Sequence, residues 1–158
     1  MTNTLQTPSL EAAKAYIYSI DFSMVIDKIV KTKHWKKSDV LKICALYRNF
    51  LFLKKKYDQQ EEKLSPSLEI DEFWHNHVLD TKKYMHDCDQ IFGRYLHHYP
   101  YLGMDGKSTE ADAARFFEKT QELHHKEFGE YIEHVRNVRR NQFISFVKQL
   151  VKRNLKGS

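Results

Sequence analysis

Residues 71–88 read DEFWHNHVLDTKKYMHDC, and this short stretch brings together several side chains that could do chemistry. It contains His75, His77 and Cys88, and His98 follows a short distance along the chain. Imidazole nitrogens and thiolates are common ligands of zinc and iron in proteins, in mixed sets that loop residues can complete. We therefore predict a metal site of the zinc or iron type with His75, His77, Cys88 and His98 as its candidate ligands.

Two other kinds of chemistry compete with metal binding at the same residues. Asp71 precedes His75 by four positions, and a carboxylate at that spacing on a helix can orient an imidazole and raise its basicity. Asp71 and His75 are therefore the candidate catalytic residues. A nucleophilic Cys88 activated by a histidine ranks below metal binding, because no local signature marks such a pair. The stretch matches neither a zinc finger nor the HExxH pattern, and the chain lacks a phosphate-binding glycine loop and a GxSxG motif.

The spacing of His75 and His77 gives them different surroundings if the segment is helical. Successive residues of a helix turn by about 100°, so these side chains point about 200° apart and cannot share one ion unless the helix ends near His77. His77 lies beside Phe73 and Trp74, and a hydrogen-bonded core histidine is the favoured interpretation for it alone. We expect His75 to be the more exposed and functional residue and His77 to be mainly structural.

The elements that must position these residues are predicted to be helices. Few glycines and prolines, five and three, disfavour a turn-rich β fold. Apolar spacing predicts helices over 9–20, from Asp21 into the thirties, 39–63, 71–79, 81–97 and from about 110 to 155, with a break near Gly129. The expected caps are Ser9, Asp21, Ser38, Asp80 with Thr81, and the pair Thr109 and Asp112. The predicted fold is a single compact all-α domain of five to seven helices with a long C-terminal helical region. In it, Cys88 and His98 share one face of the helix over 81–97.

Composition limits the class of protein and its compartment. The 158 residues carry a net charge of +5, and no apolar run approaches the roughly 20 residues of a membrane span. The N-terminus has no secretory signal pattern, and the two cysteines are expected to be reduced thiols, which favours a cytoplasmic protein. Delivery into a host cell by a non-Sec route is an alternative that rests only on size and the absence of that signal.

A second hypothesis makes the protein a non-enzymatic interaction module whose Trp-His-x-His stretch is structural. Its surface would be a basic amphipathic helix near the C-terminus, which suits an acidic protein or an anionic surface. Nucleic acid ranks below these partners. A solvated face over a buried stripe explains the same pattern equally well. The basic residues are Arg136, Arg139, Arg140, Lys148, Lys152 and Arg153, and the apolar ones are Val135, Phe143, Val147 and Leu150.

The chain resembles the glycine-rich domain-containing protein family, which is found in plants and bacteria. The matching segments are YRNFLFL (47–53), EIDEFWHNHVLDTKKYMHDC (69–88), FG (92–93), HYPYLGM (98–104) and TQELHHKEFG (120–129). The resemblance covers about 20–129 and leaves 130–156 as a basic C-terminal extension of the same domain, 1–158. It implies a helical domain with His75, His77, Asp87 and Cys88 as its polar centre, and it implies no established reaction.

Overall fold

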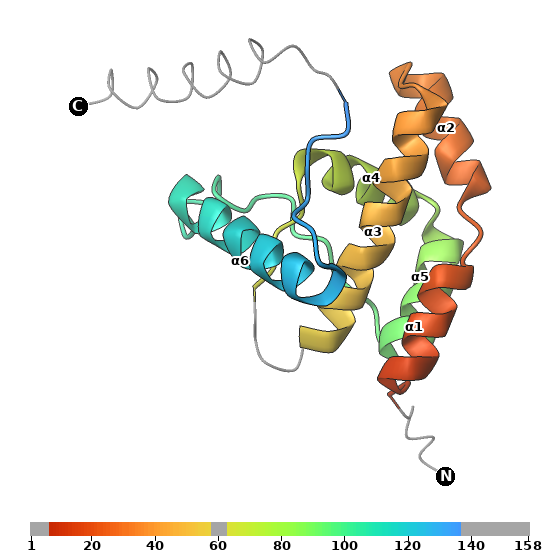
Figure 1. The fold of residues 1–158 in the computed structure, drawn as a ribbon, viewed down its shortest axis with the longest axis horizontal. Coiled ribbons are helices and arrows are strands. Elements are labelled where there is room, and N and C mark those ends of the chain that lie inside the picture. Colours follow the sequence, from red (N-terminus) through yellow and green to blue (C-terminus); the bar gives the residue numbers. More distant parts are fainter. Residues whose placement is uncertain (1–6, 58–62, 137–158) are drawn as a thin grey trace.

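The computed structural model describes residues 7–57 and 63–136, and within them the chain folds into six α-helices without a strand (Figure 1). The helices are α1 (Leu10–Ser19), α2 (Ser23–Lys33), α3 (Lys37–Tyr57), α4 (Leu68–Leu79), α5 (Thr81–Phe92) and α6 (Glu110–Phe128). The prediction of a single compact all-α fold is confirmed. None of the helices in the described ranges is both long and apolar enough to cross a membrane.

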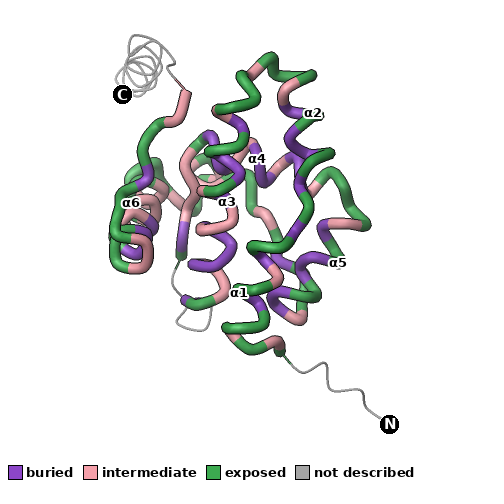
Figure 2. Tube along the Cα trace, turned by 45° about the vertical axis from the view of Figure 1, so that its right-hand side comes forward, coloured by how far each residue is buried: buried purple, intermediate pink, exposed green. Residues whose placement is uncertain are grey.

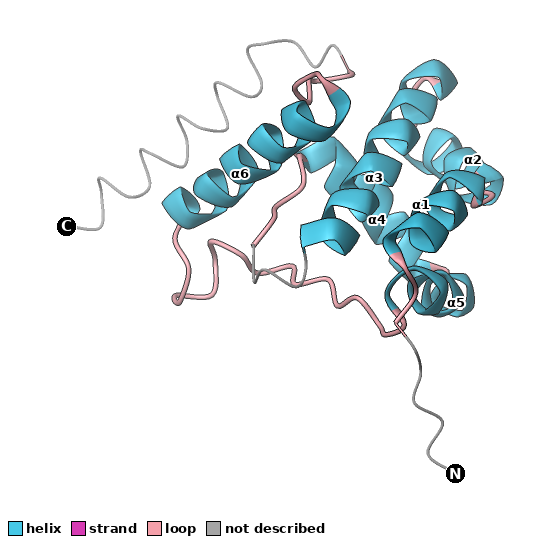
Figure 3. Cartoon of the chain, turned by 60° about the horizontal axis from the view of Figure 1, so that its bottom comes forward, coloured by secondary structure: helices cyan, strands magenta, loops and turns pink. Residues whose placement is uncertain are grey.

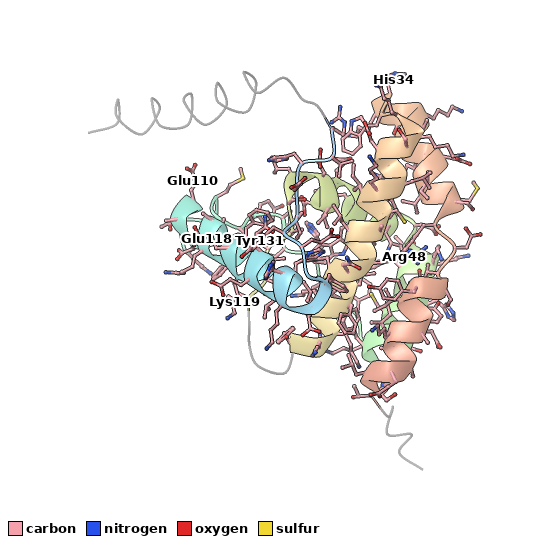
Figure 4. The ribbon with its side chains drawn as sticks, viewed as in Figure 1. His34, Arg48, Glu110, Glu118, Lys119 and Tyr131 are labelled. Atoms are coloured by element: carbon pink, nitrogen blue, oxygen red, sulfur yellow. The ribbon has the colours of Figure 1, made fainter. Side chains whose placement is uncertain are left out.

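The longest helix, α3, forms the centre of the bundle and contacts α1, α2, α4 and α6 (Figure 1). Its residues are apolar on several faces, since Tyr47, Phe50 and Leu53 have no exposed surface at all. Arg48 points from α3 toward the junction of α1 and α2 (Figure 4), where its guanidinium donates to the backbone carbonyls of Ile17 and Ile20. Burial of this kind stabilises a helix more than its intrinsic propensity does.

The buried residues concentrate where α1 to α5 face one another, and α6 is covered on one side only (Figure 2). Only Thr120, Leu123 and His124 of α6 are buried. His124 is fully buried, and its two ring nitrogens bond Asn49 on α3 and the carbonyl of Glu130. Thus α6 lies against the outside of the bundle, and its inner side borders the space between α6 and α4.

Local sequence signals place several helix ends correctly. Ser9 caps α1 by accepting from the backbone N–H of Ala12, and Thr109 with Asp112 forms the predicted capping box of α6. Gly129 adopts a left-handed conformation with φ of 79° and ends α6, which confirms the predicted break. Residues 130–136 are not helical, so the helix that was predicted to continue to 155 is absent there, and its part from 137 to 155 lies outside the described residues.

Other predicted boundaries were wrong. The helix predicted over 39–63 runs from Lys37 to Tyr57, so Ser38 lies inside its first turn and is not its cap. Phe22, not Asp21, is the residue that precedes α2, although Asp21 still accepts from the N–H of Ser23 at the start of the helix. The helix predicted over 71–79 begins three residues earlier because the Ser67 hydroxyl caps it at Ile70.

The most consequential difference is at the end of α5, which was predicted to reach residue 97. Gly93 takes a left-handed conformation with φ of 66°, and its N–H bonds the carbonyl of Asp89, so the helix ends at Phe92. The segment 93–109 is instead a long loop that crosses from α5 to the start of α6 (Figure 3). The prediction that Cys88 and His98 share a helix face is therefore wrong, because His98 belongs to this loop.

Candidate functional site

The two histidines of the motif lie on one regular helix. Because α4 continues to Leu79, His75 and His77 project from nearly opposite faces of it. The His75 side chain is 43% exposed and that of His77 is 1% exposed. The expectation about their exposure is confirmed, and the helix does not end at His77 in the way that a shared ion would require.

His75 belongs to a cluster with Asp71 and His98. Nε2 of His98 lies 2.7 Å from Oδ1 of Asp71, and Nε2 of His75 lies 3.6 Å from Oδ2 of the same carboxylate. The centroids of the two imidazole rings are 4.4 Å apart. Among the His, Cys, Asp and Glu side chains of 7–57 and 63–136, these three form the group whose ligand atoms all lie within 4.8 Å of one another.

Packing of the loop after α5 carries His98 to this position. The Tyr84 hydroxyl, on α5, donates to the backbone carbonyl of Leu96 at 2.6 Å and accepts from Nε1 of Trp74 at 2.9 Å. Leu96 is itself buried, so the loop is fixed two residues before His98. The His98 ring then packs against the edge of Trp74, with 4.4 Å between centroids. Trp74 is next to His75 on α4. Its contact with the His98 ring therefore brings His98, from the loop, to the same Asp71 carboxylate that His75 faces.

A cavity of about 830 Å³ opens beside the cluster. Asp71, Trp74 and His98 line it on one side, and residues of α3, α6 and the loops before α4 and α6 line the rest. His75 is not part of the lining, so the cluster reaches the cavity through Asp71 and His98. Volumes of this size are typical of small-molecule sites.

His77 is at the centre of a separate, buried hydrogen-bond network. Its Nδ1 lies 2.8 Å from the Tyr47 hydroxyl, and its Nε2 lies 2.8 Å from Oδ2 of Asp87. The Asp87 carboxylate also accepts from the Tyr16 hydroxyl at 2.6 Å and pairs with Lys83 at 3.1 Å. Because both ring nitrogens of His77 already have partners in this network, neither is left to bind an ion at the cluster.

The electrostatics of the network keep Asp87 charged and His77 neutral. Burial alone would raise the pKa of Asp87, but the hydrogen bonds from His77, Tyr16 and Lys83 outweigh it and hold that pKa below its ordinary value. Burial lowers the pKa of His77, and the hydrogen bond to Asp87 offsets this only in part. A neutral His77 therefore donates its Nε2 proton to Asp87 and accepts the Tyr47 proton at Nδ1.

Cys88 is also buried, with 2% of its surface exposed. Burial raises the pKa of its thiol, whereas a metal ligand or a nucleophile must be a thiolate. The structure thus divides the four predicted ligands: His75 and His98 meet at Asp71, while His77 and Cys88 lie in the interior. The sequence had named Asp71 as a partner of His75 but not as a ligand in its own right.

We expect the two motif histidines to differ in their effect on stability. His77→Ala should lower the free energy of unfolding by about 1–3 kcal/mol, because it leaves a cavity and because Tyr47 and Asp87 each lose a buried hydrogen-bond partner. His75→Ala should change it by less than about 0.5 kcal/mol, since the side chain is partly exposed and its ion-pair contact is 3.6 Å long. Urea unfolding of both variants measures the difference. Equal losses would mean that His77 is not part of a stabilising network.

The free energy of unfolding should also depend on pH through the protonation of His77. Since the pKa of His77 is lowered in the folded protein, the unfolded chain takes up the proton first, near the ordinary value of 6.5. The stability that depends on neutral His77 is fully present above that pH and is lost as the pH falls toward the lower folded pKa. His77→Ala should lose less stability than the wild type over this window.

The other walls of the cavity could not be foreseen from the motif. Lys54 lies on α3, Lys63 lies in the loop before α4, and Arg115 and Phe116 lie on α6. No local pattern connects residues so far apart in the sequence, and only the docking of α6 brings them to one space.

The alternative site, the basic C-terminal segment, lies almost wholly outside the described residues. Of its members only Val135 and Arg136 are described, and their backbone N–H groups donate to the buried carboxylate of Glu69 on α4. The Arg136 guanidinium lies over the Trp35 ring, 4.0 Å from its centroid. These contacts hold the segment after α6 against the bundle.

Residues 12–120 match the profile of the UCP032817-like family, so more than half of the chain is covered and the protein belongs to that family. The resemblance to the glycine-rich domain-containing family is therefore wrong. Several of the residues that suggested it, including Trp74, His77, Tyr84 and Asp87, hold α4 against α5, and packing of a helix pair does not identify one family. No curated protein and no solved structure matches the chain.

Proposed function

We propose that this member of the UCP032817-like family binds a divalent metal ion, zinc or iron(II), through Asp71, His75 and His98. The observation that carries the proposal is the convergence of one carboxylate and two imidazoles whose ligand atoms lie within 4.8 Å of one another. Two histidines and one carboxylate make up catalytic zinc sites and the facial triad of non-haem iron proteins.

The distances in the cluster fit this proposal. Ligands bonded at about 2.1 Å to a tetrahedral ion lie about 3.4 Å from one another. Oδ1 of Asp71 is 2.7 Å from Nε2 of His98, and Oδ2 is 3.6 Å from Nε2 of His75, so both distances are close to this separation. Without a metal, the short contact is a hydrogen bond in which Nε2 of His98 donates to Asp71. A metal would replace that proton, and its binding should therefore weaken as the pH falls.

The surroundings would supply what a three-ligand site needs. Trp74 packs against His98, and the Tyr84 hydroxyl fixes the loop that carries it, so the imidazole is held in one orientation. Three protein ligands leave coordination positions for water or a substrate. Because Asp71 and His98 line the cavity, those positions would be reached from it.

Metal analysis of the protein purified without a histidine tag tests the proposal. We expect about one zinc or iron ion per chain in the wild type. The variants Asp71→Asn, His75→Ala and His98→Ala should each bind zinc at least about tenfold more weakly, as loss of a ligand does. His86→Ala is the matched control, since His86 is an exposed histidine of α5 outside the cluster, and it should bind zinc like the wild type.

Two results would decide against the site. One is wild-type protein without stoichiometric zinc or iron, even after addition of the ions. The other is a zinc affinity that is unchanged in all three ligand variants. Cys88→Ala separates this site from the four-ligand site that the sequence suggested: it should retain the metal, because the buried Cys88 lies outside the cluster.

A further inference from the structure

The cavity beside the cluster has rigid walls of mixed character. The backbone N–H of Ser65 bonds the carbonyl of Phe116, and the Thr120 hydroxyl donates to the carbonyl of Ser65, so the loop before α4 is tied to α6. On the other side, Gly103 has a φ of 82° and donates its N–H to the Ser108 hydroxyl, which closes the loop before α6 on itself. These bonds hold the two loops in place at the edges of the cavity, and none of them crosses it.

The lining combines apolar surface with an excess of positive charge. Its four cations are Lys54, Lys63, Lys107 and Arg115, and its three carboxylates are Asp71, Asp105 and Asp112. Before any metal is counted, the lining therefore carries one net positive charge. The apolar and aromatic surface includes Leu64, Leu68, Trp74, Tyr99, Leu102 and Phe116.

Two of the three carboxylates already serve the local structure. The Asp105 carboxylate accepts hydrogen bonds from the Tyr99 hydroxyl, from the backbone N–H groups of Lys107 and Ser108, and from the Ser108 hydroxyl. Together these bonds lower the pKa of Asp105. Asp112 caps α6 at Thr109 and pairs with Arg115. The oxygens of both carboxylates therefore already have hydrogen-bond partners within the protein. Other acidic residues of α6, such as Glu110 and Glu118, lie on its exposed side (Figure 4) and do not line the cavity.

Two lysines of the lining, Lys63 and Lys107, come from the loops before α4 and α6. Lys63 lies over the Phe116 ring, with Nζ 5.8 Å from its centroid, and Lys107 lies in the loop opposite. Phosphate sites commonly use free helix N-termini and bidentate arginine. Here the N-terminus of α6 is capped by Asp112, and Arg115 is paired with the same carboxylate. The lysine ammonium groups that lie beside apolar surface can pair with the carboxylate of an apolar ligand.

We propose that this cavity binds a small organic acid, with its apolar body against Trp74 and Phe116, its carboxylate at Lys63 and Lys107, and its other end toward Asp71 and His98. This inference gives the class of ligand that the proposed metal site would take. It rests on the proposed metal binding only for the end of the ligand that would face the ion. The lysines and the apolar walls are present whether or not an ion binds. The two ideas can therefore fail independently.

Calorimetric titration with a series of probes tests the inference. The probes are phenylacetate, phenylpropionate and phenylbutyrate, the amide and the amine that correspond to the best of these acids, and phenyl phosphate. They are titrated into chelator-treated protein and, separately, into zinc-loaded protein. In the chelator-treated protein we expect at least one acid to bind with a Kd below about 10 mM. Its amide should bind about tenfold more weakly. The amine and phenyl phosphate should bind more weakly than the acid.

Variants of the lining identify where the acid binds. The double variant Lys63→Gln with Lys107→Gln should weaken binding of the acid about fivefold and leave binding of the amide unchanged, as expected for ion pairs near the surface. The matched control is Lys28→Gln with Lys42→Gln, which removes the same charge from exposed positions on α2 and α3 that do not line the cavity. It should bind the acid like the wild type.

The outcomes separate the two proposals. If the protein holds no metal but the acid is preferred over the amide and depends on Lys63 and Lys107, the cavity assignment stands and the metal site fails. Suppose instead that a metal is bound at Asp71, His75 and His98 but no acid binds. The cavity assignment is then overturned and the metal site stands. The same conclusion holds if the amide or the amine binds as tightly as the acid. An equal effect of both double variants on the acid also overturns it.

Discussion

Replacing Asp87 by asparagine should lower the free energy of unfolding by about 3–5 kcal/mol, the range for removing one partner of a buried charge network. The carboxylate is 2% exposed and accepts hydrogen bonds from His77, Tyr16 and Lys83. Asparagine has the same shape, but its amide NH₂ would face groups that themselves donate. It would also leave the Lys83 ammonium without its partner beside the core. Urea unfolding at neutral pH measures the change.

A neighbour on the same helix provides the control for this substitution. Asp89 is exposed, so Asp89→Asn should change the free energy of unfolding by less than about 0.5 kcal/mol. If Asp87→Asn cost less than about 1 kcal/mol, the carboxylate would not be the centre of a stabilising network. A double-mutant cycle with Tyr16→Phe then apportions the effect, and the two substitutions should not be additive because the side chains bond directly.

Replacing Tyr84 by phenylalanine should lower the free energy of unfolding by about 2–4 kcal/mol, because one hydroxyl serves two buried partners. Without it, the carbonyl of Leu96 and the indole N–H of Trp74 both lose their hydrogen bond in the interior. The same substitution should weaken zinc binding about tenfold, although Tyr84 is not in the cluster, because the loop that carries His98 loses its attachment. Unfolding and zinc titration are measured on the same samples.

Tyr95→Phe is the matched control for Tyr84. Tyr95 packs against Tyr84 with 5.2 Å between ring centroids, but its side chain is partly exposed. We expect it to change neither stability by more than about 0.5 kcal/mol nor zinc affinity. If Tyr84→Phe lowered stability and left zinc affinity intact, the hydroxyl would support the fold without positioning His98, and another contact would have to orient the loop.

The motif that draws attention in the sequence serves two separate purposes in the structure. One face of α4 carries His77 into a network that joins α1, α3 and α5. The other face carries Asp71 and His75 to the cluster beside the cavity. A helix can do both because residues two positions apart point in nearly opposite directions.

The features that could be predicted from the sequence depend on residues that lie close together along the chain. The helical class, the caps at Ser9 and Thr109, the break at Gly129 and the opposite directions of His75 and His77 all follow from the repeat of the helix and from side chains that bond nearby backbone groups. The buried position of His77 was predictable for the same reason, since Phe73 and Trp74 stand beside it.

The partners of His98 and the extent of the site were decided only by the tertiary structure. The sequence could not show that a left-handed Gly93 ends α5 early, or that the Tyr84 hydroxyl would fix Leu96 and so direct the following loop to Asp71. Nor could it show that α6 would dock on α3 and close the cavity. Helix formation depends on interactions a few residues apart, whereas the meeting of distant side chains depends on how loops are held by buried contacts between different elements.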